Sequence, residues 1–236
     1  FCMSVLFFTR FSCQQFRGVR ADRATVGRIL TLGLPTLVQM GSLSVVLVVM
    51  NGLLAPRAGT VGVAAFGYVS RLAEFALAPF SALCLAAAPI IGSSYGAGLH
   101  SRVRQTVVRT VQLGLVYAVA AVAVCYALSG ALLGIFTRDP AIVQFGTQCL
   151  RRLAPALLFL PPVLTVSAYF QSVNRAKSAL VTAGALPLCL CVGACLAAPL
   201  GTGAVWWAVP IAAAVCAVFC GALYIRQAGK RKRWAL

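Results

Sequence analysis

The chain has 236 residues, of which 61% are hydrophobic and only 10% are charged. Soluble domains carry about a quarter of their residues as charged side chains, so this chain cannot supply the polar coat of a soluble protein. Apolar runs of about 20 residues recur along it, and each is long enough to cross a hydrocarbon core of about 30 Å. The composition therefore predicts an integral membrane protein.

The formal net charge is +17, from 20 Lys and Arg residues against three acids. In a soluble protein such an excess would indicate a nucleic-acid partner. Here the bases lie between apolar runs, and no basic face interleaved with aromatic side chains is present. The charge is better explained as a set of topology signals, so we expect the lipid bilayer as a partner and no nucleic acid.

Six apolar spans follow one another along the chain. They cover residues 30–54, 64–95, 106–136, 144–172, 178–200 and 204–225. The connections "APRAGT", "GLHSRVR", "FTRDPA", "NRAK" and "PLGTG" carry Gly, Pro, Asn and charged residues, which interrupt helices. Backbone groups in lipid must find partners within their own segment, and these runs are too long for barrel strands. The predicted fold is an all-α six-helix transmembrane bundle.

The basic residues set the expected orientation. Fifteen lie before the first span or after the second, fourth and sixth: Arg10, Arg17, Arg20, Arg23, Arg28, Arg102, Arg104, Arg109, Arg175, Lys177, Arg226, Lys230, Arg231, Lys232 and Arg233. The opposite side offers four: Arg57, Arg138, Arg151 and Arg152. The positive-inside rule then places both chain ends in the cytoplasm of a multi-pass protein of the inner (plasma) membrane, with Trp206 and Trp207 at the outer interface.

The stretch "GSSYGAGLHSRVR" after the second span holds three glycines within seven residues, Gly92, Gly96 and Gly98. A phosphate-binding loop would require a strand before it and Lys-Ser or Lys-Thr after the glycines, and neither is present. The stretch is typical of a helix that leaves the membrane.

Five stretches resemble the multidrug and toxic compound extrusion (MATE) transporters, in the order in which that family has them. "LAAAPIIGSSYGAGLHSRVRQTV" is similar to its P-x-x-G-x-x-x-G-A-G segment, which basic residues follow. The others are "TLGLPTLVQM" (31–40), "VAAFGYVSRL" (63–72), "LLGIFTRDPAIV" (132–143) and "YFQSVNRAKSAL" (169–180). The resemblance covers about residues 25–226.

The resemblance implies that this chain is the second of two six-helix lobes in a twelve-helix transporter. Residues 1–28 then form the end of a preceding helix and a basic cytoplasmic linker, 29–226 the six-helix lobe, and 227–236 a basic cytoplasmic tail. The implied activity is secondary active antiport, which exports drugs or other organic, often cationic, compounds by alternating access. The implied partners are a missing N-terminal lobe and a small-molecule substrate.

Glu74 is the one acid inside a predicted span, and a carboxylate there is costly enough to indicate a function. It could exchange a proton during transport. Arg71 lies three residues earlier on the same helical face, so the two could instead form a structural or mouth-lining pair. By its distance from the cytoplasmic exit, Glu74 is expected near the outer mouth unless Pro79 and Pro89 bend the helix.

The resemblance bears on the driving ion, which is H⁺ or Na⁺. Sodium-coupled members carry acids in the helices that correspond to residues 30–54 and 144–172, where this chain has none. Proton-coupled members use an aspartate in the first helix, which would belong to the other lobe. Proton coupling is therefore favoured.

Other residues of the spans complete the candidate set. Polar side chains that could line a pathway, or else bond between helices, are Gln39, Asn51, Gln112, Tyr117, Tyr169 and Gln171. Cys189, Cys191, Cys195, Cys216 and Cys220 are expected to pack between helices, since no C-x-x-C pair is present and the lone histidine, His100, lies in a connection. Pro155, Pro161 and Pro162 are expected to bend the fourth span.

Two alternatives to an exporter lobe are a lobe of a lipid-linked glycan flippase and an intramembrane enzyme. The flippase would need several cationic residues for a pyrophosphate, and only Arg71, Arg151 and Arg152 lie near spans. An enzyme would need converging nucleophiles, bases or metal ligands. With one intramembrane acid and one histidine, we expect no catalytic residue, no cofactor and no metal.

Overall fold

The computed structural model describes residues 23–232. The chain divides into two compact units, Phe1–Thr31 and Leu32–Leu236, and the described part of the first consists of the opening turns of one helix. The predicted linker at 1–28 lies almost wholly outside the described residues, as does the end of the predicted tail.

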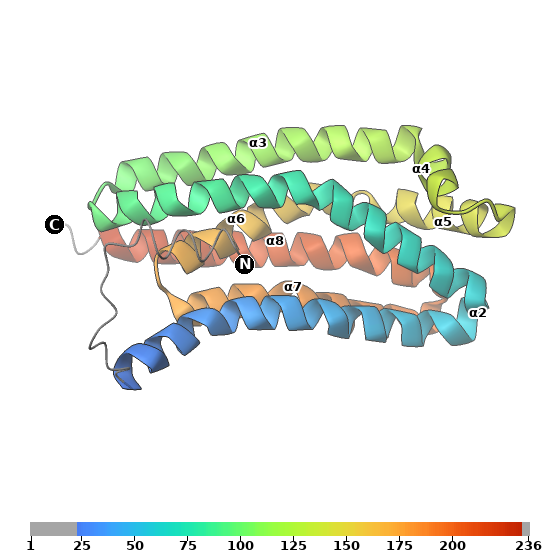
Figure 1. The fold of residues 1–236 in the computed structure, drawn as a ribbon, viewed down its shortest axis with the longest axis horizontal. Helices are drawn as coiled ribbons and strands as arrows, with labels where there is room; N and C mark the ends of the chain where they lie inside the picture. The colour runs from blue at the N-terminus through green and yellow to red at the C-terminus, as the bar shows by residue number, and fades with distance from the viewer. Residues whose placement is uncertain (1–22, 233–236) are drawn as a thin grey trace, which may run out of the picture. The chain divides into compact units, whose positions relative to one another are not determined.

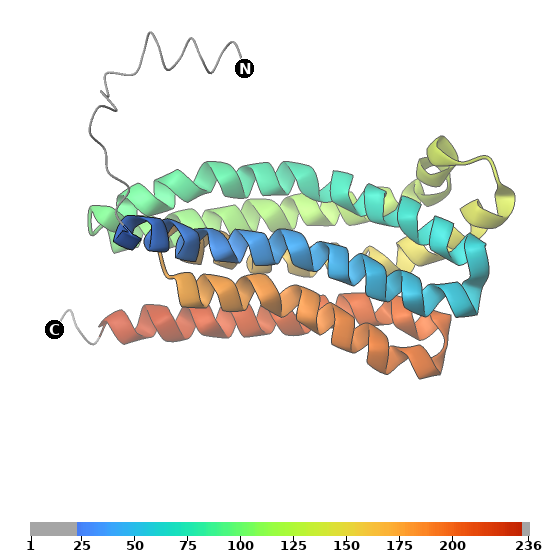
Figure 2. The ribbon, with the colours of Figure 1, turned by 60° about the horizontal axis from the view of Figure 1, so that its bottom comes forward.

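The first described element, α2 (Arg23–Gly96), contains two of the predicted spans. Its 64-residue apolar stretch Gly33–Gly96 would be about 96 Å long as one rod, which is three times the thickness of a bilayer core. Gly59 breaks it, with φ 59° and ψ −156°, a backbone conformation that is essentially restricted to glycine. From Leu32 onward the chain therefore runs out, reverses at Gly59 and returns alongside itself (Figures 1 and 2).

The remaining elements follow in chain order. They are α3 (His100–Ala127), α4 (Ser129–Phe136), α5 (Pro140–Leu153), α6 (Ala156–Ser172), α7 (Ala176–Ala197), the short 3₁₀ helix η1 (Ala198–Leu200) and α8 (Thr202–Lys232). The predicted span 106–136 is thus divided between α3 and α4, which part at Leu128. The predicted span 144–172 is divided between α5 and α6, which are bent by 53°. The bend lies at Pro155, in agreement with the expected effect of proline in this span.

Four helices of the described chain are long and apolar enough to cross a membrane, and the bent pair α5–α6 makes a fifth. In this number the stretch Gly33–Gly96 is one helix, although the chain reverses within it at Gly59. With its two halves counted separately, the arrangement has the six passes that the sequence predicts. The predicted all-helical membrane fold is confirmed.

The glycine-rich stretch after the second span is a helix end, as predicted. Gly92 and Gly96 belong to α2, and only Gly98 leaves the helical conformation, with φ 73°. The amide of Leu99 donates to the carbonyl of Ser94, which closes the end of α2 before α3 begins at His100.

Two clusters of buried side chains hold the passes together. The first includes Leu54, Phe66, Leu150 and Trp206 and so joins both halves of α2 to α5 and α8. The second joins α2, α3, α6, α7 and α8, and it includes Ile91, Val103, Phe170, Ala179, Cys216 and Cys220. Cys216 and Cys220 are fully buried, which fits the predicted packing role, whereas Cys195 is exposed.

Trp206 does not have the exposed ring expected of an interfacial tryptophan, because it is buried in this first cluster. It is 1% exposed and its ring centroid is 5.8 Å from that of Phe66, while its neighbour Trp207 is 50% exposed. Adjacent residues on a helix point about 100° apart, so two consecutive tryptophans cannot both face lipid on the same side.

The contact between α2 and α3 depends on a glycine. A Cβ atom added to Gly114 would lie 2.3 Å from the ring of Phe80, which is itself buried. We expect Gly114→Ala to lower the stability by about 1–3 kcal/mol, the usual cost of overpacking a core. The measurement is the midpoint of thermal unfolding in detergent.

Gly134→Ala is the matched control, because nothing lies within 4 Å of a Cβ atom at this helical position. It should be neutral or should stabilise by up to about 1 kcal/mol, the helix-propensity difference between the two residues. Equal effects of the two variants would contradict the role given to Gly114.

Candidate functional site

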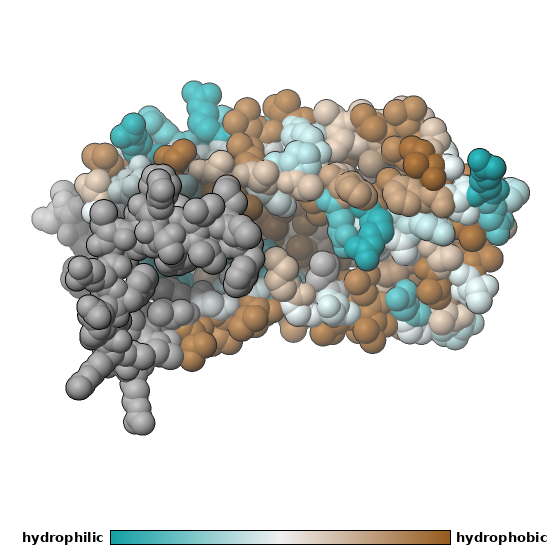
Figure 3. Space-filling model, in the orientation of Figure 1, coloured by the Kyte–Doolittle hydropathy of each residue, from teal (hydrophilic) through white to brown (hydrophobic). Residues whose placement is uncertain are grey.

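An ion pair lies on the exposed face of α2. The Nη1 atom of Arg71 is 2.8 Å from Oε2 of Glu74, and the two side chains are 67% and 43% exposed. The pairing expected from their i, i+3 spacing is thus present. Figure 3 shows hydrophilic surface gathered over the second half of α2, with apolar surface on either side of it.

The ion pair lies well inside a membrane pass. Glu74 follows Gly59 by 15 residues and precedes Gly96 by 22, or about 22 Å and 33 Å along a helix. Glu74 therefore lies along this half of α2 and not at either of its ends.

Lipid cannot cover an exposed ion pair at this position, because hydrocarbon does not solvate charge. Next to the pair, Phe75 is 69% exposed, and Pro79 removes the amide that would bond the Phe75 carbonyl within the helix. This face of α2 thus presents two charged side chains. Such a face requires water or another protein surface against it.

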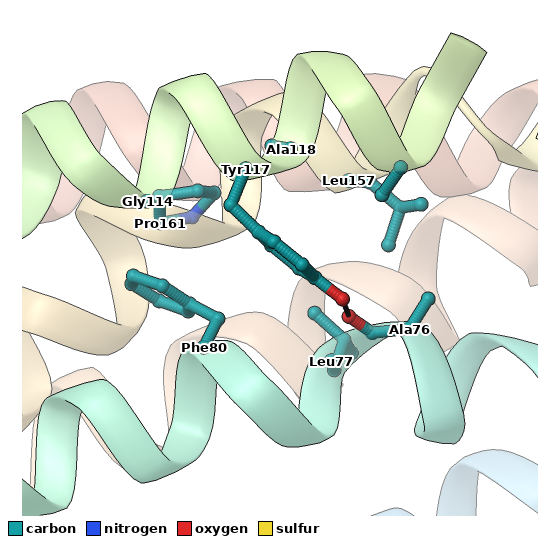
Figure 4. Close-up of a pocket in the computed structure, with 9 residues that line it drawn as sticks. Ala76, Leu77, Phe80, Gly114, Tyr117, Ala118, Leu157 and Pro161 are labelled. Atoms are coloured by element: carbon teal, nitrogen blue, oxygen red, sulfur yellow. Dashed lines mark hydrogen bonds between the residues drawn. The ribbon is translucent and has the colours of Figure 1, made fainter. Parts of the chain in front are cut away.

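Tyr117 crosses from α3 to the same half of α2. Its hydroxyl donates to the carbonyl oxygen of Ala76 at 2.8 Å, as Figure 4 shows. The bond closes a small pocket between α2, α3 and α6 whose volume of about 10 Å³ barely holds one water molecule. The pocket is lined by Ala76, Leu77, Phe80, Gly114, Tyr117, Ala118, Ala121, Leu157 and Pro161. It cannot admit an organic substrate.

Asn51 contributes a second polar group to the interior. Its Oδ1 atom is buried with no hydrogen-bond partner, and so is Nε1 of Trp206. Met50 and Leu54, on either side of Asn51, belong to the same buried cluster as Trp206. An acceptor and a donor are therefore both left unsatisfied at the end of the bundle where α2 reverses.

The other predicted residues do not join the ion pair. Gln112 is exposed on α3, and Gln39 is half-buried on the first half of α2.

Tyr169 packs its ring against Tyr224 with centroids 5.1 Å apart, and Gln171 donates to the Ser167 hydroxyl one turn earlier on α6. The structure thus pairs Arg71 with Glu74 on the exposed face of α2, and the remaining predicted polar side chains, Tyr117 included, lie elsewhere in the lobe.

A polar network that the sequence did not reveal connects α6, α7 and α8. Arg175 donates to Oε1 of Gln227, and Nε2 of Gln227 donates to the Ser178 hydroxyl at 2.7 Å. Asn174, just before Arg175, has a positive φ of 55°, which asparagine tolerates better than most residues. Gln227 lies 52 residues from Arg175, so sequence spacing gave no signal of this contact.

The comparisons with known proteins bear directly on this arrangement. Residues 35–194 match the model of the MatE family, which is more than half of the chain. The chain belongs to the MatE family. The predicted resemblance is thereby confirmed, and because this is a family of transporters, so is the prediction that the chain is not an enzyme.

Solved MATE structures share the fold. A MATE crystal structure in the bent conformation superposes with a TM-score of 0.89 at 20% identity, over 100% of this chain and 54% of that one. An outward-facing multidrug resistance MATE transporter of the MOP superfamily gives 0.87, at 20% identity over 97% of this chain and 54% of that one. An inward-facing one gives 0.79, at 20% identity over 97% and 55%. No curated protein matches the chain.

The chain therefore spans about half the length of the MATE structures that it matches. Among the described residues, the MatE lobe holds no large enclosed cavity between α2, α3 and α6, and its charged face is open. Both observations are consistent with a second lobe that covers this face.

The role of the hydrogen bond from Tyr117 to Ala76 can be tested by removing the Tyr117 hydroxyl. Tyr117→Phe should lower stability by about 0.5–1.5 kcal/mol, the net value of one hydrogen bond, and should leave the substrate range of efflux unchanged. Tyr126→Phe on the same helix is the control, because Tyr126 is 42% exposed and should tolerate the loss of its hydroxyl. If Tyr117→Phe kept full stability but altered efflux, Tyr117 would belong to the pathway and not to the helix packing.

Proposed function

We propose that this MatE lobe is one half of a secondary active antiporter that exports drugs or other organic, often cationic, compounds by alternating access. The observation that carries the proposal is the exposed Arg71–Glu74 pair within a membrane pass. A lobe that keeps charges on such a face needs a water-filled pathway or a second lobe against it. In a two-lobed transporter, the substrate site lies between the lobes, so one face supplies one wall of the pathway.

The proposed partner is an N-terminal six-helix lobe, joined through the basic segment at residues 1–28. Residues 29–226 form the lobe described above, and residues 227–236 form the tail. The proposed location is the inner (plasma) membrane, with both ends of the chain in the cytoplasm. The excess of basic residues before the first pass and after the second, fourth and sixth supports this orientation.

Proton coupling is the favoured driving reaction. Glu74 is paired with Arg71, and the other described acid, Asp139, accepts from the amide of Ala141 at the start of α5. Neither the first half of α2 nor the α5–α6 pass contains an acid that could ligate Na⁺. We therefore assign the Arg71–Glu74 pair to the wall of the pathway and leave the principal proton-binding carboxylate to the other lobe.

The charge balance of the pair can be tested in the full-length transporter. Glu74→Gln leaves Arg71 as an unpaired cation, and a charge about 10 Å from a cationic dye changes its energy by roughly 1 kcal/mol, or about fivefold in efflux. We expect efflux of cationic dyes to fall by that factor while efflux of neutral dyes is maintained. The measurement is energised dye efflux from cells, with expression levels matched.

The double variant Arg71→Gln/Glu74→Gln is the control, because it removes both charges and should restore cationic efflux. Arg57→Gln, which alters a charge at the turn between the two halves of α2, should have no effect. Equal efflux of cationic and neutral dyes by Glu74→Gln would show that the pair does not face the pathway. Complete loss of efflux of every dye would instead show that Glu74 is itself the coupling carboxylate.

The proposed orientation of the chain in the membrane can be tested separately. In a cysteine-depleted background, Arg138→Cys should react with a membrane-impermeant thiol reagent added to intact cells, and His100→Cys should react only after the cells are opened. Arg138 is exposed in the turn between α4 and α5, and His100 is exposed at the start of α3, so access to the reagent depends on the side of the membrane. Labelling of position 100 from outside would reverse the proposed topology.

A further inference from the structure

A groove of about 530 Å³ lies between the second half of α2 and the first half of α3. It lies near the turn at residues 97–99, at the end of the pass away from Gly59. Its lining is divided by chemistry into an apolar floor and a polar wall. The floor comprises Leu83, Ala86, Ala87, Ile90 and Leu113, and the wall comprises Arg102, Gln105, Thr106, Arg109 and Thr110.

The polar wall is suited to an anion. Arg102 and Arg109 lie two turns apart on α3 with Gln105 between them, and all three side chains are exposed. The hydroxyls of the two threonines donate to backbone carbonyls of their own helix, so the guanidinium and amide groups are the available donors. Figure 3 shows hydrophilic surface over this first part of α3.

No carboxylate neutralises this wall among the described residues. The two described acids have other partners, since Glu74 pairs with Arg71 and Asp139 caps α5. Neither residue belongs to the lining of the groove. Two cations therefore face a concave surface that lacks a counter-ion from the described part of the chain.

The apolar floor extends the groove along α2. From Leu83 to Ile90 it covers eight residues, or about 10 Å of helix. Ala86 and Ala87 are small, which leaves the hollow, while Ile90 and Leu113 are 51% and 57% exposed beside it. A free phosphate or a sugar phosphate would gain nothing from this floor, whereas an acyl chain would be in contact with it along its length.

The groove opens in a different direction from the ion pair. At about 100° per residue, the floor residues of α2 lie roughly 140° around the helix axis from Arg71 and Glu74. The charged face of α2 must avoid lipid, and the groove is on the other flank of the helix, beside the exposed apolar side chains of α3. Val116 on that helix is 71% exposed, as expected of a residue that faces the bilayer.

We propose that this groove binds an anionic phospholipid. The headgroup phosphate is held by Arg102, Gln105 and Arg109, and one acyl chain lies on the floor formed by Leu83, Ala86 and Ile90. Basic pockets between membrane helices favour anionic headgroups because each cation near the lipid phosphates contributes to binding. The proposal requires only that the chain spans a membrane, and it does not depend on the exporter function.

The test is a lipid titration of the purified full-length protein, followed by native mass spectrometry. The probes are phosphatidylglycerol and phosphatidylcholine with the same acyl chains. Arg102→Gln/Arg109→Gln should weaken the tightest phosphatidylglycerol site by about ten- to thirtyfold, as expected for two cations near a headgroup, and leave phosphatidylcholine binding unchanged. Lys177→Gln/Arg226→Gln is the matched control, because it removes two exposed charges outside the groove and should leave that site intact.

Ala86→Phe tests the floor without a change of charge. It should fill the hollow and weaken phosphatidylglycerol binding, while glycerol phosphate in large excess should fail to displace the lipid from the wild-type protein. Unchanged thermal unfolding of each variant shows that the fold is preserved. Equal binding of the two lipids, equal effects of the two double variants, or displacement by glycerol phosphate would each overturn the proposal. Dye efflux, measured in parallel, reports separately on the exporter function.

Discussion

Hydrocarbon provides neither water for a charge nor hydrogen-bond partners for a backbone, and the structure of this lobe follows from that constraint. The backbone of each pass satisfies itself as a helix, which explains why the described residues are helical with only short turns between them. Most charged side chains of the described residues lie in the turns and near helix ends, where water and headgroups are available. The Arg71–Glu74 pair lies on an exposed face within a pass, and we propose that lipid does not cover this side of the lobe.

Packing between the passes depends on small side chains and on a few polar contacts. Gly114 lets α3 approach Phe80 of α2, and the hydroxyl of Tyr117 joins the same two helices at Ala76.

A second set of polar contacts lies at the end of the bundle away from Gly59. There, α6, α7 and α8 are connected by Arg175, Gln227 and Ser178. The interior is thus occupied by side chains, and a substrate of drug size has no space in the core between α2, α3 and α6. The open face of α2 is therefore the surface to which we assign the wall of the pathway.

The sequence predicted the six passes, their order and most of their turns, because apolar runs and punctuating residues are local signals. It did not predict the division of one span at Leu128 or the burial of Trp206, which depend on contacts with distant helices.

Of the candidate residues, the Arg71–Glu74 pair was predictable from an i, i+3 spacing. The Tyr117 bond and the Gln227 network join residues 41 and 52 positions apart, so their partners could be found only in the folded chain. The groove between α2 and α3 was likewise invisible, since it requires two helix faces in register.

The reversal at Gly59 has a mechanical consequence for the two passes that it joins. A turn with a single non-helical residue has no extra length of chain. Neither half of α2 can therefore shift along its axis without moving the other half. Longer loops allow neighbouring helices to shift past each other by a turn, but this connection does not. The two halves therefore keep their register along the helix axis, and an axial shift of the first half carries with it the half that bears Arg71 and Glu74.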